Sequence, residues 1–153
     1  MISRVFSAID DQEHSGRAAD AAIEIARATS SMLIFFMANP AVLPGRGPII
    51  YRWTKDYIDG YFSQARLRAR QSGVYDTKCI TKNVVDVTKS ILLEAEIAEA
   101  DYIVVGSNCR PRPLGGWKHS ITREVAAKAH CPTIIVHSEQ RQRNIVSRLL
   151  AAE

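Results

Sequence analysis

Short runs of apolar residues alternate along this chain with longer segments in which apolar residues recur every three or four positions. Continuous runs are typical of strands buried on both faces, and spaced apolar positions are typical of amphipathic helices. The runs predict strands over residues 5–9, 31–38, 77–81, 101–106 and 133–137. The spaced positions predict helices from residue 15 onward, across 58–69, across 87–100 and from about residue 118.

This alternation of five strands and four helices predicts a doubly wound α/β fold. We expect a mainly parallel sheet with right-handed crossovers and helices on both faces. Segments 39–48 and 107–116 are rich in proline and glycine and are expected to be loops. At 153 residues, the chain has the size of one domain.

We place that α/β domain at residues 1–138 and an amphipathic tail at residues 139–153. Apolar residues at 145, 146, 149 and 150 form two pairs with helical spacing in the tail. We favour a short helix that packs on its own domain over a partner or membrane role.

The amino-acid composition excludes several classes of protein. With 46% hydrophobic and 24% charged residues, the chain is neither a disordered tail protein nor a coiled-coil rod. No apolar run approaches the roughly 20 residues that span a bilayer, and the N-terminus does not resemble a signal peptide. Three cysteines cannot all pair, which agrees with a reducing compartment. We therefore expect a cytoplasmic protein.

Candidate chemistry lies where the predicted strands end, because ligands of open parallel sheets bind outside the carboxyl ends of strands. Asp10 and Asp11 follow the first strand, and Ala38 and Asn39 end the second. A glycine-containing loop from Gly106 then runs into a helix, a common arrangement for holding phosphate. The dinucleotide fingerprint, the P-loop and the common hydrolase and metal motifs are absent, so we expect no catalytic or metal site.

At this loop the sequence resembles the universal stress proteins. The resemblance covers roughly residues 2–138 and is carried by segments 8–10, 13–15, 102–107, 120–125 and 130–136. It implies strand order 3-2-1-4-5, a homodimer and, in one branch of the family, ATP binding through Gly-x2-Gly-x9-Gly-Ser/Thr. Gly106, Cys109, His119 and Ser120 occupy those four positions here.

The resemblance also implies which residues would contact an adenine nucleotide such as ATP, with Mg²⁺ if it is bound. Asp10 and the backbone around Ile9 and Ala38 would face adenine and ribose, and the loop and the next helix would surround the phosphates. The implied nucleotide-binding residues are Ile9, Asp10, Ala38, Gly106, Ser107, Asn108, Cys109, His119, Ser120, Ile121 and Thr122. No general base is identifiable, so we expect a non-enzymatic stress-response or regulatory protein with at most slow ATP hydrolysis.

Departures from the family motif keep alternatives open. Two of its three glycines are replaced, and forcing a side chain into a left-handed conformation costs roughly 1–2 kcal/mol. Pro111 and Pro113 remove two N–H donors, while Arg110, Arg112 and Lys118 are placed to neutralise phosphates. Nucleotide binding through this degenerate loop therefore stands beside a dimeric interaction module that binds no nucleotide. Asp10 likewise fits either a ligand contact or a cap of the following helix.

Other residues add weaker hypotheses. Cys109, next to Arg110 and near a helix N-terminus, is a candidate thiol switch, whereas Cys79 and Cys131 are expected to be small buried residues. Trp53 begins a series of aromatic residues at positions 53, 57 and 61, which we expect to cover the sheet or a partner subunit. Arginines 66, 68 and 70 do not share one helical face, so we expect no nucleic-acid surface.

Overall fold

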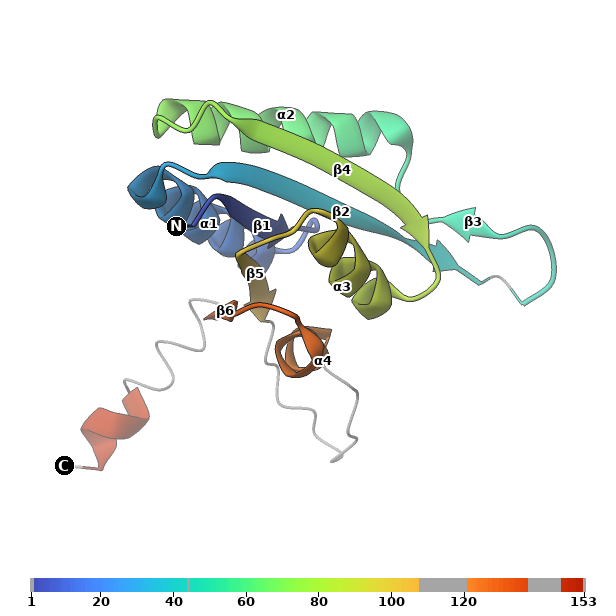
Figure 1. Ribbon diagram of the computed structural model, residues 1–153. Coiled ribbons are helices and arrows are strands. Elements are labelled where there is room, and N and C mark those ends of the chain that lie inside the picture. The colour runs from blue at the N-terminus through green and yellow to red at the C-terminus, as the bar shows by residue number, and fades with distance from the viewer. Residues whose placement is uncertain (1, 44, 108–120, 138–146, 153) are drawn as a thin grey trace.

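The computed structural model describes residues 2–43, 45–107, 121–137 and 147–152. Within these ranges the chain forms six strands and four longer helices, and residues 147–151 are also helical (Figure 1). The strands are β1 (Arg4–Ala8), β2 (Met32–Val42), β3 (Ile50–Tyr51), β4 (Thr77–Val84), β5 (Tyr102–Ser107) and β6 (Thr133–His137). The helices are α1 (Glu13–Thr29), α2 (Lys55–Gln71), α3 (Val87–Ile97) and α4 (Ile121–Lys128).

Five strands are parallel and lie in the order β4-β2-β1-β5-β6. This arrangement confirms the predicted doubly wound sheet, because the five expected strands correspond to β1, β2, β4, β5 and β6. The short strand β3 was not predicted. It pairs antiparallel with the end of β2, Tyr51 opposite Ala41 and Ile50 opposite Val42.

The expected loop at 39–48 is therefore wrong at its beginning, because β2 continues to Val42. Pro40 suggested a loop because it lacks an N–H donor. Its carbonyl still accepts a hydrogen bond from Arg52 N at 3.0 Å, and Pro40 pairs in register with Val84 of β4. The strand extends through this proline because partners distant in sequence bind it on both sides.

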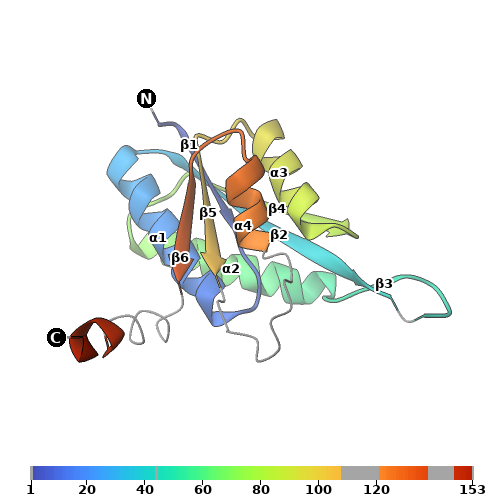
Figure 2. The same cartoon turned by 90° about the horizontal axis from the view of Figure 1, so that it is seen from below.

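Two helices cover each face of the sheet (Figure 2). Helices α1 and α2 bury their apolar sides against one face, where Val5, Phe35 and Val104 are fully buried. Helices α3 and α4 cover the other face, around Phe6 and Ile103. The alternation of core side chains between the two faces accounts for the continuous apolar runs in the sequence.

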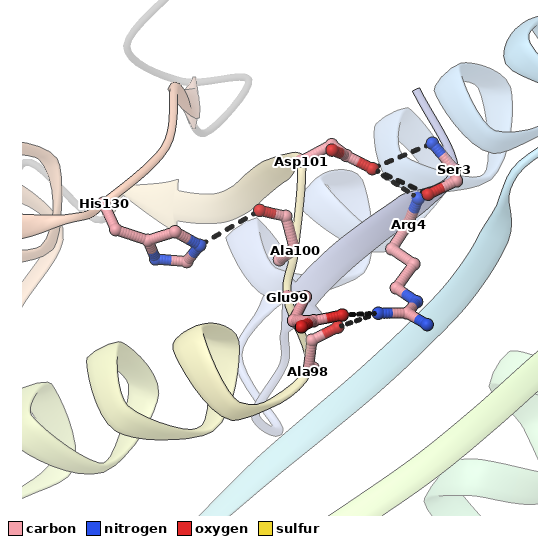
Figure 3. A network of polar contacts seen from close by, with 7 residues as sticks. All are labelled: Ser3, Arg4, Ala98, Glu99, Ala100, Asp101 and His130. Atoms are coloured by element: carbon pink, nitrogen blue, oxygen red, sulfur yellow. Dashed lines mark hydrogen bonds and ion pairs between the residues drawn. The ribbon is translucent and has the colours of Figure 1, made fainter. Parts of the chain in front are cut away.

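A polar network closes the sheet at the end where β1 and β5 begin (Figure 3). Asp101 Oδ2 accepts hydrogen bonds from Ser3 N at 2.8 Å, Arg4 N at 2.9 Å and the Ser3 hydroxyl at 3.1 Å. These donors, Ser3 N first, hold the pKa of Asp101 below its usual value. The Arg4 guanidinium lies 2.7 Å from a Glu99 carboxylate oxygen, and the His130 ring lies 3.1 Å from the Ala100 carbonyl. This end of the sheet is tied together by its own side chains.

Most of the predicted tail lies outside the described residues. Leu149 and Leu150 are both 66% exposed, and the expectation that the tail packs on its own domain stays a prediction. Among the helices that the structure describes, none is long and apolar enough to cross a membrane.

Candidate functional site

Three strand ends converge at the carboxyl edge of the sheet. Ala8, the last residue of β1, pairs with Phe36 of β2 on one side and Val105 of β5 on the other. Ile9 N then donates to the Phe36 carbonyl at 2.8 Å. The structure therefore brings Ile9 and Asp10 between the second half of β2, which contains Ala38, and the end of β5, where Gly106 and Ser107 lie. Chain connections leave β1 and β5 in opposite directions, which is where ligands bind in such sheets.

Asp10 holds the turn that leads into α1. Its backbone N–H donates to Ser15 Oγ at 2.7 Å, and its Oδ1 accepts from Gln12 N at 2.8 Å. Its Oδ2 has no hydrogen-bond partner among the residues that the structure describes. One carboxylate oxygen thus serves the local turn, as in the capping hypothesis, and the other remains available as an acceptor.

Gly106 is required by packing between β5 and α1. A Cβ atom at this position would lie 2.5 Å from the carbonyl oxygen of His14 and 2.7 Å from its carbonyl carbon. The Gly106 carbonyl also accepts a hydrogen bond from the Thr122 hydroxyl at 2.9 Å. Thr122 is buried, and its hydroxyl is already hydrogen-bonded to the backbone of β5. The neighbouring Ile121 is 45% exposed.

The rest of the predicted phosphate loop lies outside the described residues. This applies to Asn108, Cys109, His119 and Ser120, and to the basic residues Arg110, Arg112 and Lys118. The thiol-switch hypothesis for Cys109 stays a prediction for the same reason. The other two cysteines, Cys79 and Cys131, are partly buried free thiols, and burial raises the pKa of both.

A second polar cluster, the Asn39 clamp, lies beside Asp10 and was not predicted. The Asn39 side chain accepts from Trp53 N and donates to the Trp53 carbonyl, both at 2.9 Å, and also donates to Asn83 Oδ1 at 3.0 Å. Asn39 is 3% exposed, so its amide is buried with its bonds satisfied. The clamp fixes the chain that returns from β3 against the ends of β2 and β4.

Asp11 joins this cluster through both of its carboxylate oxygens. Its Oδ2 accepts from the Trp53 indole N–H at 3.3 Å, and its Oδ1 lies 3.7 Å from the Arg52 guanidinium. Arg52 also lies over the Trp53 ring, 5.1 Å from its centroid. Sequence spacing carries no signal for this contact, since more than forty residues separate Asp11 from Trp53.

The aromatic residues expected on one helix face form a stack. Ring centroids of Trp53 and Tyr57, and of Tyr57 and Tyr61, lie 6.3 Å apart. Trp53 and Tyr61 pack against the core, which confirms that this face covers the sheet, while Tyr57 is 45% exposed. Burial, and then the negative charge of Asp10, raise the pKa of Tyr61. A cavity of about 70 Å³ lies between α1 and α2 here, lined in part by Ile9 and Tyr61.

The electrostatics of this edge differ on its two sides. Asp10 and Asp11 bring two carboxylates to the end of β1, where they favour hydroxyl and N–H donors and repel phosphate. The N-terminus of α4 and the end of β5 lie on the other side, where a helix dipole favours anions. A ligand with hydroxyl groups at one end and a phosphate at the other fits this polarity.

Comparisons with known proteins agree with the fold. The model of the universal stress protein family matches residues 1–137 of this chain. No curated protein matches the chain.

Solved structures of low sequence identity share the architecture. A universal stress protein crystallised in complex with cAMP is 24% identical, with a TM-score of 0.72 over 90% of this chain and 98% of that one. UspA from Lactobacillus plantarum is 16% identical, with a TM-score of 0.65 over 88% and 97%. The universal stress protein from Archaeoglobus fulgidus in complex with dAMP is 22% identical, with a TM-score of 0.57 over 89% and 98%.

Proposed function

This chain belongs to the universal stress protein family, and we propose that it is a regulatory protein that binds an adenine nucleotide at the carboxyl ends of β1, β2 and β5. The observation that carries this proposal is the unbonded Oδ2 of Asp10 at the point where the chain connections reverse. The structures of two proteins with the same fold contain cAMP and dAMP, each an adenine nucleotide with one phosphate.

In this proposal, Asp10 Oδ2 accepts a hydrogen bond from a ribose hydroxyl, because a carboxylate offers only acceptors at neutral pH. Adenine lies against the backbone near Ile9 and Ala38. The phosphate lies toward the N-terminus of α4, near Ser107, Asn108, Cys109 and the segment His119, Ser120, Ile121 and Thr122. ATP with Mg²⁺ remains a candidate ligand beside the monophosphates. Because the sequence identifies no general base, the proposed role is nucleotide binding and regulation, with at most slow ATP hydrolysis.

A second candidate is a homodimeric interaction module that binds no nucleotide. The packing of Gly106 favours this second candidate. The close approach of His14 explains why position 106 is a glycine without any ligand. A motif glycine kept for packing is therefore no evidence that phosphate binding survives. The oligomeric state proposed in both candidates, a homodimer, is measured by analytical ultracentrifugation.

The variant Asp10→Asn distinguishes the two candidates. Asparagine keeps an acceptor for Gln12 N, so the turn into α1 survives, but it replaces the free oxygen by an N–H donor. We expect cAMP, AMP or ATP with Mg²⁺ to bind the wild-type protein in calorimetric titrations, and D10N to bind about tenfold more weakly, a difference of about 1.4 kcal/mol. Asp11→Asn is the control for loss of one negative charge, since both carboxylate oxygens of Asp11 already have protein partners.

Two results would count against nucleotide binding at Asp10. One is the absence of heat with any of the three nucleotides at millimolar concentration, together with no nucleotide in native mass spectra of the freshly purified protein. The other is equal affinity of D10N and the wild-type protein, which would place the ligand elsewhere. The first result would leave the interaction module as the function.

A further inference from the structure

Strand β4 forms an open edge of the sheet. It is eight residues long and, within the described chain, pairs only with β2. Leu33 N donates to the Asp76 carbonyl at 2.9 Å, and Leu33 pairs with Thr77. Because parallel ladders alternate, the backbone groups of Cys79, Thr81 and Asn83 point away from β2 toward the open edge. These groups form a template for one more strand.

Four exposed cations flank this edge on both faces of the sheet. Lys78 and Lys82 share a face with Ile80, which packs into the core under α3. Arg66 approaches from α2 on the other face, where its Nε donates to Cys79 Sγ at 3.2 Å. Arg70 follows one helical turn after Arg66, on the same side of α2. None of the four forms an ion pair with a described residue.

This charge pattern decides which strand fits the edge. A second copy of the chain pairing antiparallel here would place the lysines of both copies on one face of the joint sheet, where like charges repel. An extended segment with carboxylates on alternate residues would instead neutralise Lys78 and Lys82 on one face. Further carboxylates on its other face would meet Arg66 and Arg70.

We propose that the open edge of β4 is a docking strand for an extended acidic segment of another protein, which pairs with it by β-augmentation. Backbone hydrogen bonds to Cys79, Thr81 and Asn83 supply the pairing, and the four cations select the acidic sequence. Arg66 is held against Cys79 before the segment arrives, so less side-chain freedom is lost on binding. The inference is independent of nucleotide binding, which concerns the carboxyl ends of other strands.

The probe is a blocked peptide of about eight residues, the length of β4, in which glutamate alternates with valine. We expect the full-length protein to bind it, and K78E/K82E to bind it about tenfold more weakly. R27E/K128E is the matched control, since it changes the net charge equally on α1 and α4. A lysine–valine peptide should not bind, and a glutamate–valine peptide with methylated backbone nitrogens should lose most of its affinity, because it cannot donate to the edge.

Three outcomes would overturn the proposal. The first is no binding of the acidic peptide at millimolar concentration. The second is equal binding by K78E/K82E and R27E/K128E, which would mean that net charge alone attracts the peptide. The third is self-association of K78T/K82T combined with no peptide binding by the wild-type protein. That result would indicate that Lys78 and Lys82 prevent other strands from pairing with this edge.

Discussion

Replacing Gly106 by alanine tests whether this glycine is present for packing or for phosphate. The added Cβ would lie 2.5 Å from the His14 carbonyl oxygen, 2.7 Å from its carbon and 2.8 Å from its ring. Two of these three atoms are backbone, so relief requires the first turn of α1 to move away from β5. Overpacking of a core costs about 1–3 kcal/mol, and we expect the upper end of that range because no rotamer change removes the clash.

The assay is urea unfolding of the ligand-free protein followed by circular dichroism. A loss of about 3 kcal/mol corresponds to a fall in Tm of roughly 10 °C for a domain of this size. Gly60→Ala is the control, because Gly60 lies inside α2 with no atom within 4 Å of the added Cβ. We expect G60A to gain about 0.5–1 kcal/mol from helix propensity. If G106A unfolds within about 0.5 kcal/mol of the wild-type protein, the packing explanation is wrong and phosphate contact becomes the better explanation.

Two further predictions concern stability and do not involve the proposed nucleotide contact. The Ser7 hydroxyl is fully buried and has no hydrogen-bond partner among the described residues, so Ser7→Ala should raise the free energy of unfolding by about 1 kcal/mol. Ser15→Ala should instead lower the free energy of unfolding by about 1–2 kcal/mol, because Asp10 N loses its acceptor. A loss of stability in both serine variants would contradict this reasoning. The pKa of Asp101 is lowered by Ser3 N and Arg4 N, so its carboxylate stabilises the fold above its unfolded pKa near 3.8. That contribution is lost as the pH falls below about 4. The urea midpoint, measured from pH 5 to pH 2.5, should therefore depend less on pH in D101N than in the wild-type protein. Identical pH dependence in the two proteins would refute this role of Asp101.

The fold could be predicted from the sequence because its signals are local. Each buried strand is a continuous apolar run, and each helix repeats its apolar residues within a few turns. Val5, Phe35 and Val104 belong to such runs and are fully buried. Strand β3 could not be predicted in this way. Its two ladder pairs join residues eight and ten positions apart across a segment rich in proline and glycine, where local preferences favour a loop.

The candidate site could be predicted only in part, for a related reason. Strand ends pointed to Asp10, Ala38 and Gly106 because parallel topology brings carboxyl ends together. The Asn39 clamp and the approach of His14 to Gly106 could not be predicted from the spacing of residues along the sequence. Each depends on how distant segments pack together. The motif position of Gly106 suggested phosphate contact, whereas its steric surroundings give a structural reason.

The two ends of the sheet differ in how their carboxylates are used, and the proposed nucleotide site rests on this difference. At one end, Asp101 Oδ2 accepts three hydrogen bonds and closes the fold. At the other end, Asp10 uses one oxygen for the turn and leaves the second without a described partner. Asp10 is only half-buried, so water reaches this edge, and a ligand that brings a hydrogen-bond donor would take the place of water at the second oxygen. A ribose hydroxyl is such a donor, so the proposed contact at Asp10 does not depend on phosphate binding after β5.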